Sequence, residues 1–220
     1  TSTHAASLVE LKDGRLRAFW FSGSREGAPD VTINSALYDP TANTWWREQV
    51  IAGRKSTQLG LHRLIAKVGN PVAVRAANGE LWLFYVTVSL GGWAGSSITL
   101  MTSNDEGESW SAPRRLVTSP FINISTLVKG APFFYADGTM GLPVYHEFIS
   151  KFSEILRLDQ TGKVIDKQRL AAGGQGTLGA DQQGVGHRSL VFGTRRLGGL
   201  ERLGRIAAGD VAQGVGGSRG

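Results

Sequence analysis

The sequence contains no cysteine and no hydrophobic run long enough to cross a membrane. Without cysteine, disulfide frameworks and thiolate metal sites are both excluded. The longest apolar stretch, about residues 81–90, includes Thr87 and Ser89 and falls short of the ~20 residues that a spanning helix needs. The four histidines lie far apart, and no glycine-rich loop ends in Lys-Ser or Lys-Thr. We therefore expect no metal, no other cofactor and no membrane span.

Clustered basic motifs are also missing, although the formal net charge is +6 and the isoelectric point is near 9.9. Zinc-finger spacing, an RRM motif and a basic-region helix are all absent, so nucleic acid is not an expected partner. Residues 171–220 hold 15 of the 30 glycines, six arginines and none of the tryptophans. This segment is either a flexible Gly/Arg-rich tail or sequence read out of frame, and it contributes half of the net charge. The compartment of the protein is left open.

Residues 1–170 contain three Asp-Gly or Asn-Gly pairs between apolar runs, at Gly14, Gly79 and Gly138. Such pairs are strong hairpin signals because both turn positions favour φ > 0. Gly79 follows Gly14 by 65 residues, and Trp110 follows Trp45 by the same distance. The matched spacing indicates a repeated unit rather than isolated hairpins.

Each repeat contains four candidate strands. They are residues 4–11, 16–23, 32–39 and 45–52 in the first, 69–76, 80–88, 96–104 and 112–118 in the second, and 129–136, 139–147, 152–159 and 163–170 in the third. Four antiparallel strands repeated head to tail are typical of a β-propeller blade. The sequence therefore predicts an all-β fold with about three propeller blades in an incomplete ring. A β-sandwich of short strands is the alternative.

The second repeat carries an octet that fits the pattern S-x-D-x-G-x-[ST]-W. Its fixed positions are Ser103, Asp105, Gly107, Ser109 and Trp110. Serine and aspartate side chains can accept backbone N–H bonds, glycine permits φ > 0, and tryptophan can pack between neighbouring sheets. We expect a structural turn rather than a reactive site.

This octet resembles the Asp-box (BNR) repeat of the sialidase superfamily, and residues 3–170 are similar to bacterial sialidase-like BNR proteins. Longer similar stretches are residues 22–31, 91–97, 119–125 and 143–148. The resemblance implies a glycosidase with a tyrosine nucleophile, a glutamate base partner, an aspartate acid/base and three arginines for a substrate carboxylate. It also implies six blades, so this chain resembles the N-terminal half of such a protein.

By this resemblance, His4 stands where the first arginine is expected, which weakens recognition of sialic acid. Asp30, in the loop before the third strand, is the candidate acid/base; alternatively it caps a turn beside Pro29. Arg25 and Glu26 share that loop as a substrate clamp or as a solvent-facing pair.

Tyr145, His146 and Glu147 follow an apolar strand, in which neighbouring side chains alternate between faces. Tyr145 and Glu147 therefore share one face, which suits a phenol nucleophile with a carboxylate base, and His146 takes the other as a candidate substrate contact. Alternatively, Tyr145 belongs to the core and Glu147 is a loop acid.

Further candidates for substrate binding lie at predicted strand ends. They are Lys67, Asn70, Trp93, Ser96 and Asn123, with Trp93 placed to stack on a sugar ring. Asn123 also begins an N-glycosylation sequon with Ser125. Each of these residues, taken alone, favours loop architecture over a ligand contact, but together they lie at strand ends, where propellers bind ligands.

The sequence thus favours a sialidase-like exo-glycosidase, or a fragment of one, that removes a terminal sugar from a glycan. A non-catalytic Asp-box propeller that binds carbohydrate or protein is the alternative. We expect the 220-residue chain by itself to show little or no hydrolase activity, because an incomplete ring lacks the later site residues. Its open sheet edges make self-association a further expectation.

Overall fold

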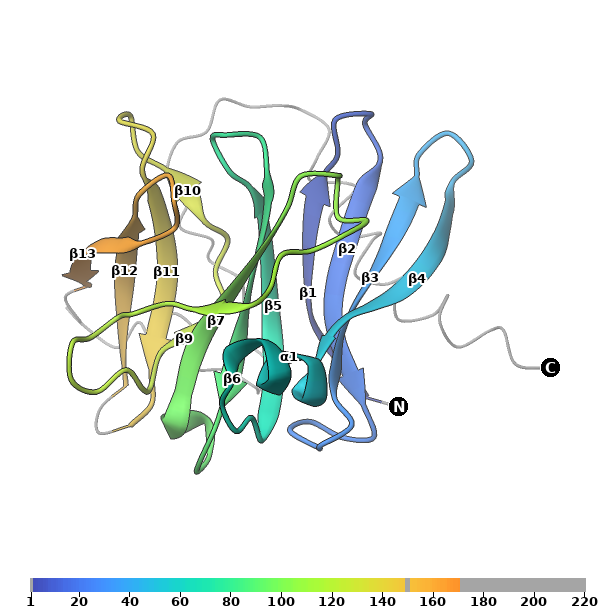
Figure 1. Ribbon diagram of the computed structural model, residues 1–220. Coiled ribbons are helices and arrows are strands. Elements are labelled where there is room, and N and C mark those ends of the chain that lie inside the picture. Colours follow the sequence, from blue (N-terminus) through green and yellow to red (C-terminus); the bar gives the residue numbers. More distant parts are fainter. Residues whose placement is uncertain (1, 149–150, 171–220) are drawn as a thin grey trace, which may run out of the picture. The chain divides into compact units, whose positions relative to one another are not determined.

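A computed structural model describes residues 2–148 and 151–170, and every structural statement below refers to these residues. They form three antiparallel sheets (Figure 1). The tail predicted for residues 171–220, and the two explanations for it, lie outside the described residues. None of the described helices is long and apolar enough to cross a membrane.

Three sheets follow one another along the chain, two of four strands and a third of five. In each, four strands pair in sequence order, and the fifth strand of the third sheet pairs outside this order. The first contains β1 (Ser2–Glu10), β2 (Leu16–Gly23), β3 (Thr32–Asp39) and β4 (Thr44–Gly53). The second contains β5 (Lys67–Arg75), β6 (Leu81–Val88), β7 (Ser96–Ser103) and β8 (Arg114–Arg115). The third contains β10 (Phe133–Phe134), β11 (Met140–His146), β12 (Phe152–Leu158) and β13 (Val164–Arg169), and β9 (Leu127–Val128) also pairs with β11.

The prediction of four-stranded antiparallel blades is confirmed, and most strand boundaries differ from it by one or two residues. Of the strand expected at residues 129–136 only β10 forms, and β9 lies just before that range; Gly130 and Pro132 separate the two. Pro132 cannot donate a ladder hydrogen bond. The helix α1 (Arg54–Leu61) and the 3-10 turn η1 (Trp93–Gly95) were not predicted.

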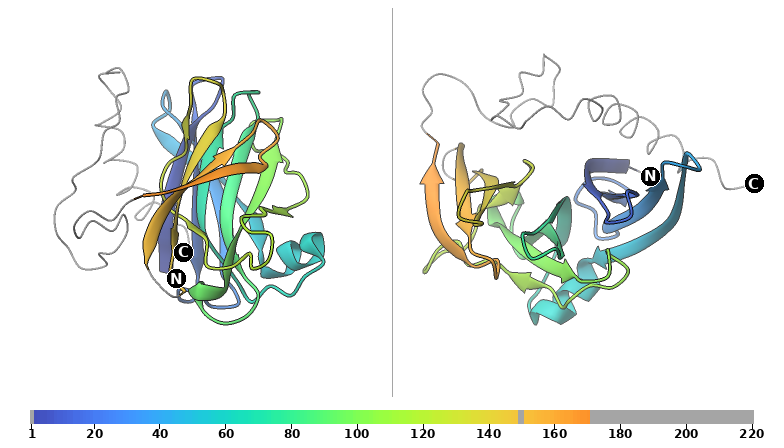
Figure 2. Two further views of the ribbon diagram at one scale, coloured as in Figure 1. Left: turned by 90° about the vertical axis from the view of Figure 1, so that its left-hand side faces the viewer. Right: turned by 90° about the horizontal axis from the view of Figure 1, so that it is seen from above.

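The middle sheet is buried on both faces, as the strand β6 shows most clearly. Leu83 and Tyr85 belong to the hydrophobic cluster shared with the first sheet, whereas Trp82 and Phe84 belong to the cluster shared with the third. This division follows from the alternation of side chains along a strand. Seen from above, the three sheets fan out side by side with β4 and β13 at the outer ends (Figure 2). They are three blades of a propeller whose ring is incomplete.

The Asp-box turn follows β7 and has the geometry that the sequence predicts. Ser103 Oγ accepts the Gly107 N–H at 2.8 Å, and Asp105 Oδ1 accepts the Ser109 N–H at 2.9 Å. Gly107 has φ +87°, a conformation that side chains disfavour. The Trp110 ring meets the edge of Phe19 from the first sheet, with 5.7 Å between ring centroids. The turn therefore joins the second blade to the first.

Two glutamates at variable positions of the Asp-box strengthen this junction. Glu108 pairs with Arg17 at 2.8 Å and with Arg47 at 2.7 Å, and both arginines lie in the first sheet. Glu106 accepts the Lys12 N–H at 3.1 Å and also pairs with Arg75. Because Arg17 is almost fully buried, loss of Glu108 would leave a buried charge without its partner, so this pair is the costliest part of the network to break.

We expect acid to destabilise the fold by protonating Asp105 in the Asp-box. Asp105→Asn should remove this part of the pH dependence. Hydrogen bonds from Ser109 lower the pKa of Asp105 to about 2, below the 3.8 of an unfolded aspartate. The charged carboxylate therefore stabilises the fold fully above pH 4, and this contribution is lost as the pH falls through 2. Urea unfolding between pH 2 and 5 should show a shallower pH slope for Asp105→Asn. Equal slopes in the two proteins would contradict the prediction.

Candidate functional site

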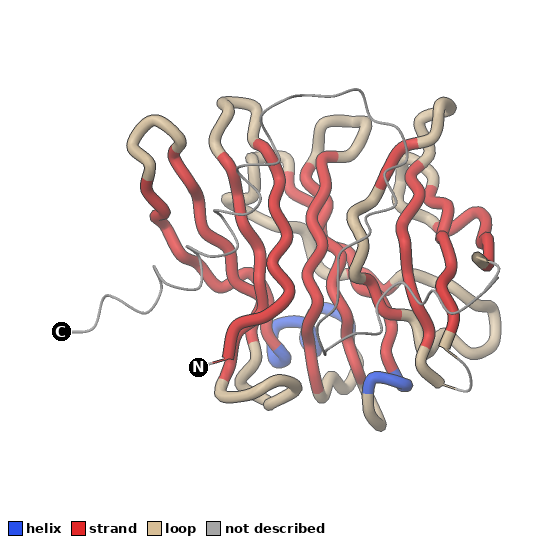
Figure 3. Tube along the Cα trace, turned by 180° about the vertical axis from the view of Figure 1, so that it is seen from behind, coloured by secondary structure: helices blue, strands red, loops and turns tan. Residues whose placement is uncertain are grey.

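The sequence-predicted site residues gather at one end of the three sheets, opposite the Asp-box. The strand register places the start of β1 beside the end of β2, and likewise Lys67 of β5 beside Val88 of β6. At the same end of the third sheet, Tyr145 of β11 pairs with Leu127 of β9. The tube view from behind shows the strands of all three sheets running between these two ends (Figure 3).

Asn70 lies in a distorted part of β5, the first strand of the second sheet. Its φ is +45°, and the register with β6 shifts between Gly69 and Val72. The first sheet repeats the distortion 65 residues earlier, where Ala5 has φ +55° and the register also shifts. A left-handed residue other than glycine is strained, and such strain is frequent at functional sites. At Asn70 the bulge presents an amide side chain.

Tyr145 is half-buried, and groups from all three sheets influence the pKa of its phenol. Burial raises the pKa of the Tyr145 phenol, and the negative charges of Glu147 and Glu26 raise it further. Hydrogen bonding with the Asn70 side chain acts in the opposite direction. Glu26 comes from the first sheet, Asn70 from the second, and Tyr145 with Glu147 from the third. Tyr145 is thus protonated at neutral pH, with two carboxylates near it.

Asp30 is exposed and engaged within its own loop. Its carboxylate accepts the Ser24 N–H at 2.8 Å and the Ser24 hydroxyl at 3.0 Å. These bonds, with a smaller effect of the Arg25 charge, lower the pKa of Asp30. The geometry is that of a turn cap, which the sequence indicates as the alternative to an acid/base. To act as a general acid, Asp30 must be released from Ser24 when substrate binds.

Lys67 connects the loop of Asp30 with the second sheet. A Cβ atom on Gly27 would lie 3.4 Å from Lys67 Nζ, so this amine lies close over the loop. The same amine lies 5.8 Å from the centre of the Trp93 ring, a cation–π arrangement. The Trp93 ring in turn approaches Gly69, where a Cβ would meet it at 3.1 Å. Lys67 and Trp93 therefore form one packed unit beside Asn70.

The two other charged candidates of that loop, Arg25 and Glu26, are exposed. His4 stacks on Phe21, with 5.5 Å between ring centroids, and bonds to Ser2 through Nε2. This contact holds the imidazole against the first sheet at the site end.

Three further candidates are occupied by contacts within the fold. His146 Nε2 bonds to Glu154 Oε2 at 3.1 Å, and its ring stacks on Phe152 at 4.3 Å. Ser96 is fully buried and donates to the Thr126 carbonyl at 3.2 Å. The Asn123 amide donates to the Leu116 carbonyl at 2.6 Å and its oxygen accepts the Thr118 N–H. These contacts join or close loops and leave little of each side chain for a ligand.

Two serines form hydrogen bonds with candidate residues and were not predicted from the sequence. Ser24 holds Asp30, and Ser125 accepts the backbone N–H groups of Glu147 and Phe148. Ser24 precedes Asp30 by six residues and Ser125 precedes Glu147 by 22, so no local spacing marks either pair. The only sequence signal at Ser125 was its place in the sequon.

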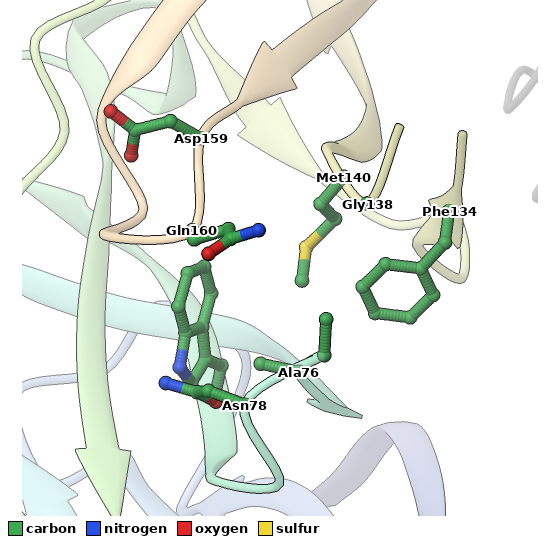
Figure 4. Close-up of a pocket in the computed structure, with 9 residues that line it drawn as sticks. Ala76, Asn78, Phe134, Gly138, Met140, Asp159 and Gln160 are labelled. Atoms are coloured by element: carbon green, nitrogen blue, oxygen red, sulfur yellow. The ribbon is translucent and has the colours of Figure 1, made fainter. Parts of the chain in front are cut away.

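A small pocket lies at the opposite end of the second and third sheets (Figure 4). Its lining includes Trp82, Phe134, Met140 and Gln160. It has room for about one water molecule, which is too little for a sugar ring. Within the described ranges, no group of three or more histidine, aspartate or glutamate side chains could hold a metal ion.

Comparison with known proteins identifies a family and solved structures with the same fold. A family model described as a BNR repeat-like domain matches residues 14–204, which extends beyond the described residues. No curated protein sequence matches the chain.

Three solved structures share the fold at low sequence identity. The Hadza microbial sialidase Hz136 is 18% identical with a TM-score of 0.59, over 74% of this chain and 36% of that one. The NanB sialidase from Streptococcus pneumoniae is 11% identical with a TM-score of 0.58, over 77% and 44%. A protein of unknown function from Dyadobacter fermentans is 14% identical with a TM-score of 0.58, over 76% and 53%. The chain therefore spans between about a third and a half of the length of these proteins.

Proposed function

The chain belongs to the family of BNR repeat-like domains, and we propose that it forms part of a sialidase-like exo-glycosidase that hydrolyses a terminal sugar from a glycan. The observation that carries the proposal is the arrangement at one end of the three blades, where the loop of Asp30, the distorted segment of β5 at Asn70 and the end of β11 at Tyr145 lie. Similar structures include two sialidases, which supports the fold but not the choice of sugar. Since the chain spans about half of such proteins or less, the activity belongs to a complete ring of blades.

In the proposed reaction, the Tyr145 oxygen attacks the anomeric carbon while its proton passes to the Glu147 carboxylate. Asp30, released from Ser24 and protonated when the substrate binds, donates its proton to the glycosidic oxygen, and the aglycone leaves. The Asp30 carboxylate then removes a proton from water, which attacks the anomeric carbon and releases the sugar. Tyr145 leaves as the phenol after Glu147 returns its proton. The raised pKa of Tyr145 makes a base partner necessary, because the phenol does not ionise by itself near neutral pH.

The substrate in this proposal lies over Trp93, between the loop of Arg25 and Glu26 and the amide of Asn70. A sugar ring stacks well on an indole, and the charged and amide groups can bond to its hydroxyls. Lys67 Nζ lies 5.8 Å from the centre of the Trp93 ring. It would bind an acidic group on the sugar as a point charge, since it lacks the bidentate geometry of arginine.

A non-catalytic propeller that binds carbohydrate or protein is the second candidate function. The observation in its favour is Asp30, whose carboxylate is exposed, ionised and bonded to Ser24 rather than poised to donate a proton. His4 in place of the arginine expected from the family resemblance favours the same conclusion.

Substituting Asp30→Asn in the complete protein separates the two functions. If the protein is a glycosidase, kcat should fall by roughly 10²–10⁴-fold, the usual contribution of a general acid. If it is a binding module, glycan binding should persist and neither form should hydrolyse the glycan. Aryl glycosides and a glycan array provide the two measurements.

Asp159→Asn is a matched control for this experiment. Asp159 also caps a turn, where it accepts the Thr161 and Lys163 N–H groups at 2.9 Å, but it lies at the opposite end of the third sheet. Its substitution should leave both hydrolysis and binding unchanged. Hydrolysis that survives Asp30→Asn intact would exclude Asp30 as the acid/base.

A further inference from the structure

Ser125 occupies an unusual position directly before β9. Its φ is +65°, its side chain is 5% exposed, and its hydroxyl oxygen accepts the N–H groups of two successive residues. Glu147 N lies 2.9 Å and Phe148 N lies 2.8 Å from this oxygen. A residue other than glycine with φ > 0 is strained, so the surrounding structure must hold Ser125 in place.

The bonds from Glu147 and Phe148 to Ser125 lie just beyond the end of the hydrogen-bond ladder between β9 and β11. Leu127 pairs with Tyr145 and Val128 pairs with Val144, so the chain before Leu127 runs beside the chain after Tyr145. At Ser125 the left-handed backbone turns out of this alignment, and the side-chain oxygen takes the place of a backbone acceptor. The two bonds fix the peptide groups on both sides of the Glu147 Cα atom, and thereby the direction of its Cα–Cβ bond.

We propose that Ser125 is a positioning residue that holds the Glu147 carboxylate beside the Tyr145 phenol. The inference rests on the proposed function, in which Glu147 is the base for Tyr145. A carboxylate on a loop explores many directions, and a catalytic pair needs one of them. Ser125 restricts Glu147 through the backbone and leaves both carboxylate oxygens available to accept the phenol proton.

A purely structural role for Ser125 would give a different result from a positioning role. Loss of the hydroxyl would then cost stability but leave the electrostatic environment of Tyr145 unchanged. With positioning, loss of the hydroxyl lets Glu147 turn toward water, where its charge is screened. The pKa of Tyr145 should then fall, because one of the charges that raise it has moved away.

The test is an NMR titration of the 220-residue chain labelled with ¹³C at the tyrosine ζ position. The chain has four tyrosines, and Tyr145→Phe identifies the resonance of interest. Glu147→Gln should lower the pKa of Tyr145, and Ser125→Ala should reproduce a large part of that shift. Ser125→Gly removes the same hydroxyl while relieving the positive φ, so it replaces Ser125→Ala if that variant fails to fold.

Ser103→Ala is the matched control, since Ser103 is also a buried serine whose oxygen accepts backbone N–H groups, but in the Asp-box at the opposite end. It should destabilise the chain without moving the pKa of Tyr145. If Glu147→Gln shifts this pKa and both Ser125 variants leave it unchanged, the positioning role is wrong and the Tyr145–Glu147 pair stands. If Glu147→Gln causes no shift, the pair itself fails, and with it the role of Ser125.

Discussion

Replacing Tyr145 by phenylalanine in the complete protein is expected to lower kcat for glycoside hydrolysis by at least about 10³-fold, since the nucleophile is lost while the ring is kept. KM should change little, because the phenyl ring fills the same space and the proposed substrate contacts come from other residues. Steady-state kinetics with an aryl glycoside measure both constants, and rapid quenching of the reaction shows whether a covalent intermediate forms.

The control for this substitution is Tyr135→Phe. Tyr135 lies in the same sheet, but beside the Asp137-Gly138 turn at the opposite end, where its ring packs under Arg157 at 4.6 Å. Its hydroxyl has no part in the proposed reaction, so kcat should be unchanged. A Tyr145→Phe variant that retains most of the wild-type kcat would eliminate the phenol as nucleophile and favour a binding module.

The sheets could be predicted from sequence because their signals are local and repeated. Each Asp-Gly or Asn-Gly pair forces a hairpin, and the 65-residue spacing between Gly14 and Gly79 fixes the repeat. The Asp-box was equally accessible, since Ser103, Asp105 and Gly107 bond to one another within a few residues. Alternation along β11 also placed His146 apart from Tyr145, as its contact with Glu154 shows.

The sequence could not show which candidate residues are available to a ligand and which are used to hold loops in place. Ser96, Asn123 and His146 have side chains that suit a sugar, yet their partners are groups in other segments of the fold. Such pairings depend on how blades and loops come together, which no spacing in one sequence encodes. For the same reason Ser24 was not predicted as the partner of Asp30, although its bonds lower the pKa of the carboxylate; the sequence indicated only a turn cap beside Pro29 as the alternative to an acid/base.

The junction between the first two blades depends on a single glycine in the Asp-box, and Gly107→Ala should destabilise the fold by about 3 kcal/mol or more. A left-handed residue with a Cβ costs about 1–2 kcal/mol. The added Cβ would also lie 2.8 Å from Nε and 2.9 Å from Cδ of Arg17. Arg17 cannot move aside freely, because it is buried and bonds to Glu108 and Ser35. Displacing a buried charge from its partners adds the rest of the cost.

Gly79→Ala separates the cost of backbone strain from the cost of the clash with Arg17. Gly79 has φ +85°, nearly the same as Gly107, but nothing lies within 4 Å of the Cβ position. Its substitution should therefore cost only the backbone strain of about 1–2 kcal/mol. Urea unfolding of both variants measures the difference, and combining Gly107→Ala with Arg17→Ala should reduce the additional cost toward zero, as a double-mutant cycle requires for a direct clash. Equal destabilisation by the two glycine substitutions would mean that Arg17 is free to move, and that the blades are joined chiefly by the apolar contact of Trp110 with Phe19.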